Sequence, residues 1–522
     1  ADGAADGAAA GRGDRSDTPF REAAVMKSSR SRPRILLVVI TLIASAGCSP
    51  HALRDTDLPE VEIPERFETP DGPNVAAPDA WWTSFGEPAL DRTMQAAFAS
   101  NLGLRQAWSR LEQSNAQARI AGAFLYPEVD LDAAASRTRT DPADFPATTS
   151  DRFAIGLGLT WEIDLWRRIA NRADAATLLA RASRADAEQT ALLLSGSITE
   201  LWFSIQEQEQ LLVLFEGQTE LSRTLLELTE LRYGQGVGDG LQVLQQRLQL
   251  ESVIAAIPEV RSTLETSRNQ LAVLLARTPE SLADDPPFTA IPTLPELPPF
   301  PILPSPRDLL ERRPDLRAAH DRVAAADLEV AVAIADMLPA LRVSLDGRFS
   351  GDQLSSLFDS TIASLSGAIL QPVFDAGRRG AEADRRRAIL QERVDGFTER
   401  FIVALREVED AIDRERNLVE LLEQVRIQVD LADRTLIESR IRFANAQIEY
   451  LDVITAIRAL QDLQRREIGV ERSVLANRAR LLLAIGGAWT RDLAPPDAEN
   501  PRKPNQRAAN DPDDSSIRNS ES

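Results

Sequence analysis

Two long segments without proline set the first limit on the fold of this chain. Residues 147–257 and 373–494 contain no proline, the residue that most reliably interrupts an α-helix. Within them, Arg168 to Tyr233 and Gly380 to Phe443 predict continuous helices of roughly 65 residues, which at 1.5 Å per residue would be about 100 Å long. Ordinary globular helices are much shorter, so we expect these two to pack lengthwise against other long helices.

The apolar residues of both segments support this prediction. They follow steps of three, four and seven residues, the spacing of a coiled-coil seam, with Gln218 as one polar interruption. The residues concerned are Leu211, Leu214, Leu221, Leu225 and Leu228 in the first segment, and Leu405, Val408, Ile412, Val419, Leu422 and Val429 in the second.

The two segments belong to a repeated pattern with an offset of about 210 residues, which indicates a duplicated architecture. Leu104-Arg105-x-Ala107 corresponds to Leu316-Arg317-x-Ala319, and Leu231-Arg232-Tyr233 corresponds to Ile441-Arg442-Phe443. The alternative is that two Ala/Leu/Arg-rich helical stretches align by composition alone.

Each predicted long helix is followed by a short turn and a second helix. The first turn holds four glycines, at positions 234, 236, 238 and 240, which permit a tight reversal. The second turn spans Ala444 to Tyr450. We therefore expect two helical hairpins, each with its tip at the far end of a long helix.

Segments with a period of two precede both long helices. Large apolar residues alternate with small or polar ones in Val129–Ala134, Phe153–Ile163, Leu341–Asp346 and Leu365–Ile369, which predicts two strands per repeat. A half-buried soluble sheet and a transmembrane barrel would both give this alternation. Four strands cannot close a barrel around a lumen, so a barrel would need several chains, and three would supply twelve strands.

Composition excludes several function classes. The net charge of −21 argues against a nucleic-acid partner, because phosphate binding needs a basic face. One cysteine and two histidines exclude an internal disulfide framework and a cysteine-rich metal site. No phosphate-binding glycine loop or serine elbow is visible, so we expect no enzyme, no catalytic residue, no metal and no cofactor.

The cysteine lies at the end of a segment with the layout of a secretory signal. Met26 opens a stretch with four basic residues, the apolar run Ile35–Ile43 follows, and Ala46-Gly47-Cys48 closes it. This ending resembles a bacterial lipoprotein cleavage box, in which Cys48 becomes the lipidated first residue, although Ser45 stands where an aliphatic residue is usual. The alternative is an ordinary cleaved signal with an incidental cysteine.

These features divide the chain into seven parts. They are an upstream unstructured extension (1–25), the signal (26–47), a Pro-rich tether (48–78), the first repeat (79–278), a Pro-rich crossover (279–306), the second repeat (307–490) and a disordered tail (491–522).

Several motifs in this order resemble the outer-membrane efflux channels of the TolC/OprM type, especially their nodulation-related (NodT-like) lipoprotein branch. The resemblance covers Trp81 to Trp489. The motifs are Trp81-Trp82-x-x-Phe85 with Leu90, Trp161-Glu162-Ile163-Asp164-Leu165, Arg313-Pro314-Asp315-Leu316, Gln371-Pro372-Val373-Phe374-Asp375-x-Gly377-Arg378, Tyr450-Leu451-Asp452-Val453 and Ile485-Gly486-Gly487-Ala488-Trp489. One departure is Arg167, which stands where the family usually has glycine, and we expect it to leave the fold unchanged.

The resemblance implies a mainly α fold with a small β part, assembled as a homotrimer with a 12-stranded β-barrel continued by a 12-helix α-barrel. It implies a channel that passively exports drugs or other small solutes received from an inner-membrane pump through a periplasmic adaptor. The protein would be lipid-anchored in the outer membrane, in contact with its lipids, and would extend into the periplasm.

The resemblance also implies a periplasmic gate at the hairpin tips. Asp452 matches an aspartate of that gate, and Arg458 matches a basic residue that bonds across helices. Thr455 stands where a second aspartate is common, and Asp239 of the first tip is expected to add to the acidic ring. Asp452 could equally be a helix N-terminal carboxylate that the helix dipole favours.

Two other classes stay open as alternatives. A periplasmic adaptor lipoprotein would also have an anchor and a hairpin, but the duplication argues against it. A coiled-coil scaffold would explain the long helices, but not the alternating strands or the signal.

Overall fold

The computed structural model describes residues 51–52, 62–69, 74–283, 293–445 and 447–495. The predicted extension, the predicted signal and Cys48 lie outside the described residues, as do most of the tail and parts of the tether and the crossover. Those assignments stay predictions.

The main helices occur in matched pairs, which confirms the duplication. Both members of each pair have the same length, 22 residues in the first pair, 67 in the second and 35 in the third. The pairs are α3 (Leu102–Ala123) with α8 (Pro314–Ala335), α4 (Arg168–Gly234) with α9 (Arg378–Ala444), and α5 (Gly240–Leu274) with α10 (Tyr450–Ala484). The predicted long helices are therefore present.

Shorter helices connect and flank these pairs. They are η1 (Trp81–Phe85), α2 (Pro88–Ser100), α6 (Pro279–Ala283), η3 (Pro306–Asp308), α7 (Leu309–Arg312), η4 (Leu354–Ser356) and η5 (Trp489–Asp492). Of the helices within the described ranges, none is both long enough and apolar enough to cross a membrane.

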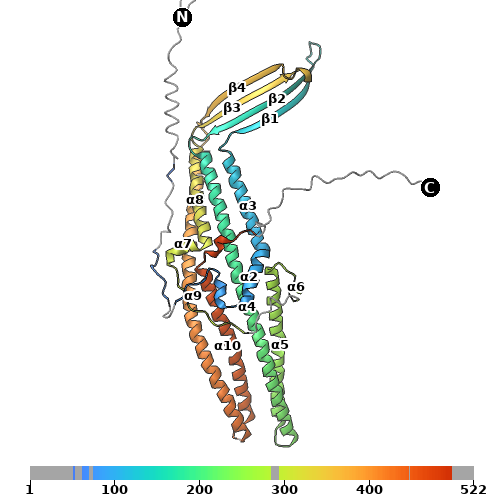
Figure 1. The fold of residues 1–522 in the computed structure, drawn as a ribbon, viewed down its shortest axis with the longest axis vertical. Helices are drawn as coiled ribbons and strands as arrows, with labels where there is room; N and C mark the ends of the chain where they lie inside the picture. The colour runs from blue at the N-terminus through green and yellow to red at the C-terminus, as the bar shows by residue number, and fades with distance from the viewer. Residues whose placement is uncertain (1–50, 53–61, 70–73, 284–292, 446, 496–522) are drawn as a thin grey trace, which may run out of the picture. The chain divides into compact units, whose positions relative to one another are not determined.

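Four antiparallel strands form one sheet with the order β1-β2-β3-β4, which confirms two strands per repeat. The strands are β1 (Glu128–Thr140), β2 (Thr148–Ile163), β3 (Ala340–Gly351) and β4 (Ser360–Leu370). They are longer than the alternating segments in the sequence. Figure 1 shows the sheet at one end of the long helices and the two hairpin tips at the other.

The two faces of the sheet differ in polarity because the register places like residues beside one another. Leu131 lies opposite Leu157, and Leu345 lies opposite Leu365, on the apolar face. The other face is polar. Asp132, Gly156 and Arg348 lie in one row across three strands there, and Arg348 Nη2 donates to Asp132 Oδ2 at 2.8 Å.

Gly156 makes this cross-strand ion pair possible. A Cβ atom at position 156 would lie 2.5 Å from Asp132 Oδ1, so any larger residue would displace the carboxylate. The glycine thus lets Asp132 reach past β2 to Arg348.

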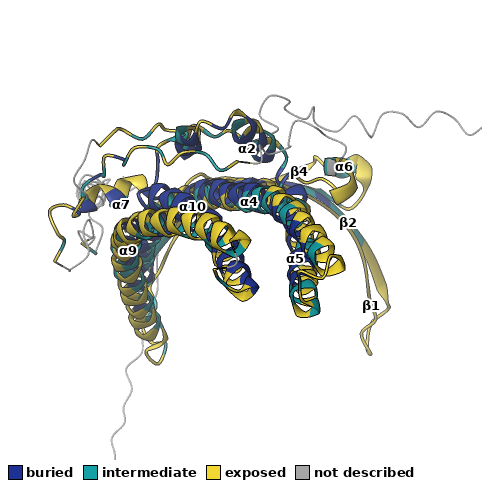
Figure 2. Cartoon of the chain, turned by 90° about the horizontal axis from the view of Figure 1, so that it is seen from below, coloured by how far each residue is buried: buried dark blue, intermediate teal, exposed yellow. Residues whose placement is uncertain are grey.

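The helices pack side by side in the order α3, α4, α8, α9. Figure 2 views them along their length and shows a curved layer, with α2 and α7 on its convex side. The largest core lies at mid-length, where Trp81, Trp82 and Phe85 pack against α4 and against the end of the second repeat. Trp82 makes an edge-to-face contact with Trp489, with ring centroids 4.9 Å apart.

Both 67-residue helices begin after a residue in the left-handed region. That residue is Gly377 (φ +84°) in the second repeat and Arg167 (φ +57°) in the first. Arg167 therefore keeps the turn that glycine adopts more easily.

Arg167→Gly should raise the stability of the first repeat. We expect a gain of about 0.5–1 kcal/mol in the free energy of unfolding, because a non-glycine residue in this region carries a steric cost. The exposed ion pair lost with Asp174, at 3.3 Å, contributes little. The measurement is thermal unfolding in detergent, with Gly377→Arg as the reverse change, which should lower the midpoint. A lower midpoint for Arg167→Gly would contradict the prediction.

Candidate functional site

The two hairpin tips bring together most of the residues predicted to form a gate. Asp239 is the N-cap of α5, where its Oδ1 accepts from the backbone N–H of Leu241 at 3.2 Å. Asp452 lies in the first turn of α10, in a capping box with Glu449, whose N–H donates to Asp452 Oδ2 at 3.2 Å. Both carboxylates are exposed. Each therefore has a capping role within its own helix, and each can still contribute negative charge at a tip.

Arg458 connects the two hairpins. Its Nε donates to Gln249 Oε1 of α5 at 2.6 Å, and Gln249 Nε2 donates in turn to Gln461 Oε1 of α10 at 2.8 Å. The two glutamines are buried. Thr455, which stands where the resembling family commonly has a second aspartate, is exposed and donates its hydroxyl to the carbonyl of Leu451 at 2.8 Å.

Tyr450 makes a second connection nearer the tip. Its hydroxyl donates to Gln246 Oε1 of α5 at 2.6 Å, and Gln246 Nε2 donates to the carbonyl of Ser222 on α4 at 2.8 Å. Burial raises the pKa of Tyr450 to about 12, because the phenolate would be poorly solvated there. We call Gln246, Gln249, Tyr450, Arg458 and Gln461 the inter-hairpin seam.

Tyr450 should ionise only at strongly alkaline pH. Because the folded-state pKa of Tyr450 lies above the unfolded value, its contribution to stability is complete below about pH 10 and is lost as the pH rises through about 12. Ultraviolet titration of phenolate in the folded protein should therefore show a step near pH 12 that Tyr450→Phe removes. A titration curve that Tyr450→Phe leaves unchanged near pH 12 would refute the assignment.

The sequence did not single out the three glutamines of the seam. Gln246 and Gln249 lie on the stripe of α5 that also carries the buried residues Leu250 and Val253. A glutamine on an otherwise apolar helical stripe indicates a polar contact between helices, because a buried side-chain amide requires a hydrogen-bond partner. The identity of that partner could not be read from the pattern.

An apolar cluster and a groove accompany the seam. Leu225, Leu436, Tyr450, Val453 and Ile454 are buried together, so the tip of each hairpin supports the other.

A cavity of 400 Å³, which we call the tip groove, lies between α4 and α9 over the start of α10. Its lining includes exposed Leu228, Ile437 and Ile441 and two basic residues, Arg232 and Arg440.

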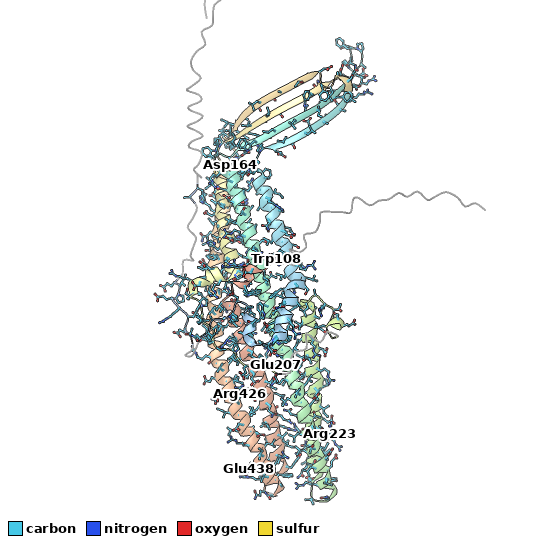
Figure 3. The ribbon with its side chains drawn as sticks, viewed as in Figure 1. Trp108, Asp164, Glu207, Arg223, Arg426 and Glu438 are labelled. Atoms are coloured by element: carbon cyan, nitrogen blue, oxygen red, sulfur yellow. The ribbon has the colours of Figure 1, made fainter. Side chains whose placement is uncertain are left out.

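Ion pairs join the helices farther from the tips. In the second hairpin, Arg426 on α9 lies 2.7 Å from Glu471 and 3.4 Å from Glu467 on α10. Figure 3 labels Arg426 above Glu438, which lies nearer the tip, and Arg223 on α4 of the other hairpin. No cluster of three or more metal-ligating side chains occurs within the residues that the structure describes.

The chain is similar to known proteins over most of its length. The family model described as outer membrane efflux protein matches residues 93–277 and 305–487, one segment in each repeat. The pyoverdine export outer membrane protein OpmQ of Pseudomonas putida is 29% identical over 435 residues, which are 80% of this chain and 90% of OpmQ. The probable outer membrane lipoprotein SilC of Salmonella typhimurium is 25% identical over 87% of this chain and 98% of SilC.

Solved structures share the fold. The outer-membrane channel OprN superposes with a TM-score of 0.79, at 24% identity, over 85% of this chain and all of OprN. The open state of the Neisseria gonorrhoeae MtrE outer membrane channel gives a TM-score of 0.75, at 22% identity, over 85% of this chain and 99% of MtrE.

Proposed function

Because the chain belongs to the outer membrane efflux protein family, we propose that three copies form the outer-membrane channel of a tripartite efflux system. The channel would passively export small solutes delivered by an inner-membrane pump through a periplasmic adaptor. The relatives named above are export and outer-membrane proteins, and none is named as an enzyme.

The sheet carries the argument for a trimer. On its apolar face, Leu131, Leu365 and Ile369 are 72%, 75% and 74% exposed in the single chain. Strands β1 and β4 are the two edges of the sheet, with no neighbouring strand on their outer sides among the described residues. Long exposed edges favour pairing with another chain. Three sheets joined edge to edge would close a twelve-stranded barrel with its apolar face toward lipid and the Asp132–Arg348 face toward the lumen.

The helices offer matching surfaces for neighbouring copies. Leu241, Leu244 and Leu248 on α5 are exposed at helical spacing, as are Ile427 and Leu431 on α9, which lie outside the tip groove. Apolar stripes of this kind are buried when helices pack together. In a twelve-helix barrel, α5 of one copy would pack beside α9 of the next.

The tip groove supports an adaptor as partner. It combines apolar side chains with Arg232 and Arg440, so an amphipathic helix that carries acidic residues would fit it. We place the adaptor at this groove, on the outside of the tips.

The gate and the lipid anchor complete the proposal. The inter-hairpin seam would hold the tips closed, and three copies of Asp452 and of Asp239 would form the acidic ring that attracts cations. Cys48 would be lipidated and anchored in the inner leaflet of the outer membrane.

The test combines imaging with conductance. Electron microscopy of the purified protein in detergent should show three-fold particles with a long helical barrel. In planar bilayers, Gln249→Leu should raise the open probability several-fold, because it removes the acceptor of Arg458 and the donor to Gln461. Gln245→Leu, one helical turn earlier and outside the seam, is the matched control. Monomeric particles would refute the channel, whereas trimers unaffected by Gln249→Leu would refute only the gate.

A further inference from the structure

A second cavity, with a volume of 640 Å³, lies at mid-length of the helices, far from the tips. It is formed by α4, α8, α9, the η3–α7 segment and η5. Figure 2 shows α7 on the convex side of the curved helical layer, away from the concave side on which α5 and α10 end. The cavity is therefore separate from both the tip groove and the seam.

The lining of this cavity is unusually basic for the chain. Five arginines contribute to it: Arg181, Arg184, Arg307, Arg317 and Arg491. They face three acidic lining residues, Asp308, Glu311 and Asp321. The lining residues thus carry two more positive than negative charges, or one more when buried Glu188, the partner of Arg184 and Arg317, is included, in a chain whose net charge is −21. This local reversal of charge would attract anions.

One of the arginines has a structural role. Arg184 Nε donates to Glu188 at 3.0 Å, and its Nη2 donates to the carbonyls of Arg491 and Leu493 at 2.9 and 2.7 Å. Its guanidinium also lies 4.5 Å from the centroid of the Trp108 ring, which Figure 3 labels at mid-length. Arg184 therefore holds η5 against α4 and forms a fixed wall of the cavity.

Other arginines keep donors available for a ligand. Arg317 Nη2 bonds to buried Glu188, but Arg317 Nε is buried and has no hydrogen-bond partner among the described residues. Arg181 has one ion pair, at 3.1 Å to Asp321, and its side chain is 66% exposed. Arg307 is exposed at the rim. Because Arg317 Nε is enclosed, a ligand in the cavity would meet the exposed donors of Arg181 and Arg307.

We propose that this arginine cavity binds an organic anion with two or more carboxylate or phosphate groups. Guanidinium groups recognise both anions through paired, charge-assisted hydrogen bonds. Phe397 and Leu310 supply an apolar surface for the body of such a ligand. The volume lies within the range of small-molecule sites. Since the cavity lies on the convex side, its ligand would come from the surrounding fluid and not from the transported solutes.

The test is calorimetric titration of the full-length protein in a neutral detergent, at constant ionic strength, with citrate and with inorganic phosphate. The double variant Arg181→Ala/Arg307→Ala, which we call the cavity variant, removes two arginine side chains from the lining. It leaves the contacts of Arg184 intact. The double variant Arg387→Ala/Arg434→Ala is the control with the same charge change. Both residues are exposed on α9 and, among the described residues, pair with acids of their own helix, Asp384 at 2.6 Å and Asp430 at 2.9 Å.

We expect saturable binding of citrate, weakened about tenfold or more in the cavity variant and changed less than about twofold in the control. Inorganic phosphate, with a single anionic group, should bind more weakly than citrate, and tighter binding of phosphate would contradict a ligand with several anionic groups. Thermal unfolding of both variants checks that the fold is kept. Absence of saturable binding in the unaltered protein would overturn the proposal. Equal affinity in the cavity variant and the control would do the same, because it would show only a general charge effect.

Discussion

Arg478→Leu should lower the free energy of unfolding by about 3–5 kcal/mol, because it leaves a buried carboxylate without its partner. Arg478 on α10 and Glu415 on α9 are 2% and 4% exposed. Arg478 Nε and Nη2 donate to the two oxygens of Glu415 at 2.9 and 2.5 Å. The same guanidinium donates to the carbonyls of Pro298 and Pro299, at 2.5 and 2.6 Å, and lies 5.2 Å from the Phe300 ring centroid.

Arg478 therefore holds residues 298–300 of the crossover against the second hairpin. Val75, in the preceding tether, pairs in turn with Phe300 and Ile302 through two backbone hydrogen bonds of 2.9 Å. Loss of Arg478 should thus release the segment around Pro298 as well as weaken the pairing of α9 and α10. We expect faster proteolysis of residues 293–305 in the variant.

The measurements are chemical unfolding, followed by tryptophan fluorescence in detergent, and limited digestion with a broad-specificity protease. Arg480→Leu is the matched control, because Arg480 lies two residues away and its 3.0 Å ion pair with Glu200 is half exposed. The control should change stability by less than about 1 kcal/mol. Glu415→Leu combined with Arg478→Met should recover much of the loss, since no buried charge stays unpaired. Equal effects of Arg478→Leu and Arg480→Leu would contradict the argument.

Arg313→Met should have the second-largest effect, a loss of about 3 kcal/mol, because it removes the hydrogen bonds that a buried guanidinium makes to two carboxylates and a backbone carbonyl. Arg313 is 7% exposed and lies at the N-cap of α8. Its Nε and Nη2 donate to Asp315 at 3.1 and 2.9 Å, and its Nη1 donates to Glu407 at 2.6 Å and to the carbonyl of Ala484 at 3.2 Å. One side chain thus connects α8, α9 and the end of α10.

Arg313→Lys should lie between Arg313→Met and the unaltered protein, because lysine keeps the charge but cannot form the two-point contact with Asp315. Arg312→Met is the control, since Arg312 is the neighbouring residue and is exposed. It should alter stability by less than about 0.5 kcal/mol. Unfolding curves in which Arg312→Met and Arg313→Met coincide would refute the role assigned to Arg313.

The sequence predicted the secondary structure well because the signals are local. The absence of proline and the regular apolar spacing predicted two very long helices, and the structure gives 67 residues for each. The strands were found by their period of two, but their lengths were underestimated. Polar residues such as Arg137 and Asp151 extend β1 and β2, and the 2.6 Å ion pair between them forms only after the strands pair.

The candidate site was only partly predictable. A resemblance pointed to Asp452 and Arg458, and the structure places Arg458 against Gln249 of the other hairpin. No sequence spacing indicates that contact, because the two residues are 209 positions apart. The same holds for the arginine cavity, whose lining comes from five separate segments of the chain.

The sequence by itself determined the duplicated order of helices and strands and the hairpin turns, since each depends on neighbours within a few residues. Only the tertiary structure decided which polar residues are buried and paired. Arg478 and Arg480 look alike in the sequence, yet one is enclosed by Glu415 and the crossover and the other faces solvent. The physical reason is that the free energy of a charged group depends on its distance to partners and on its solvation, and both are set by how distant segments pack.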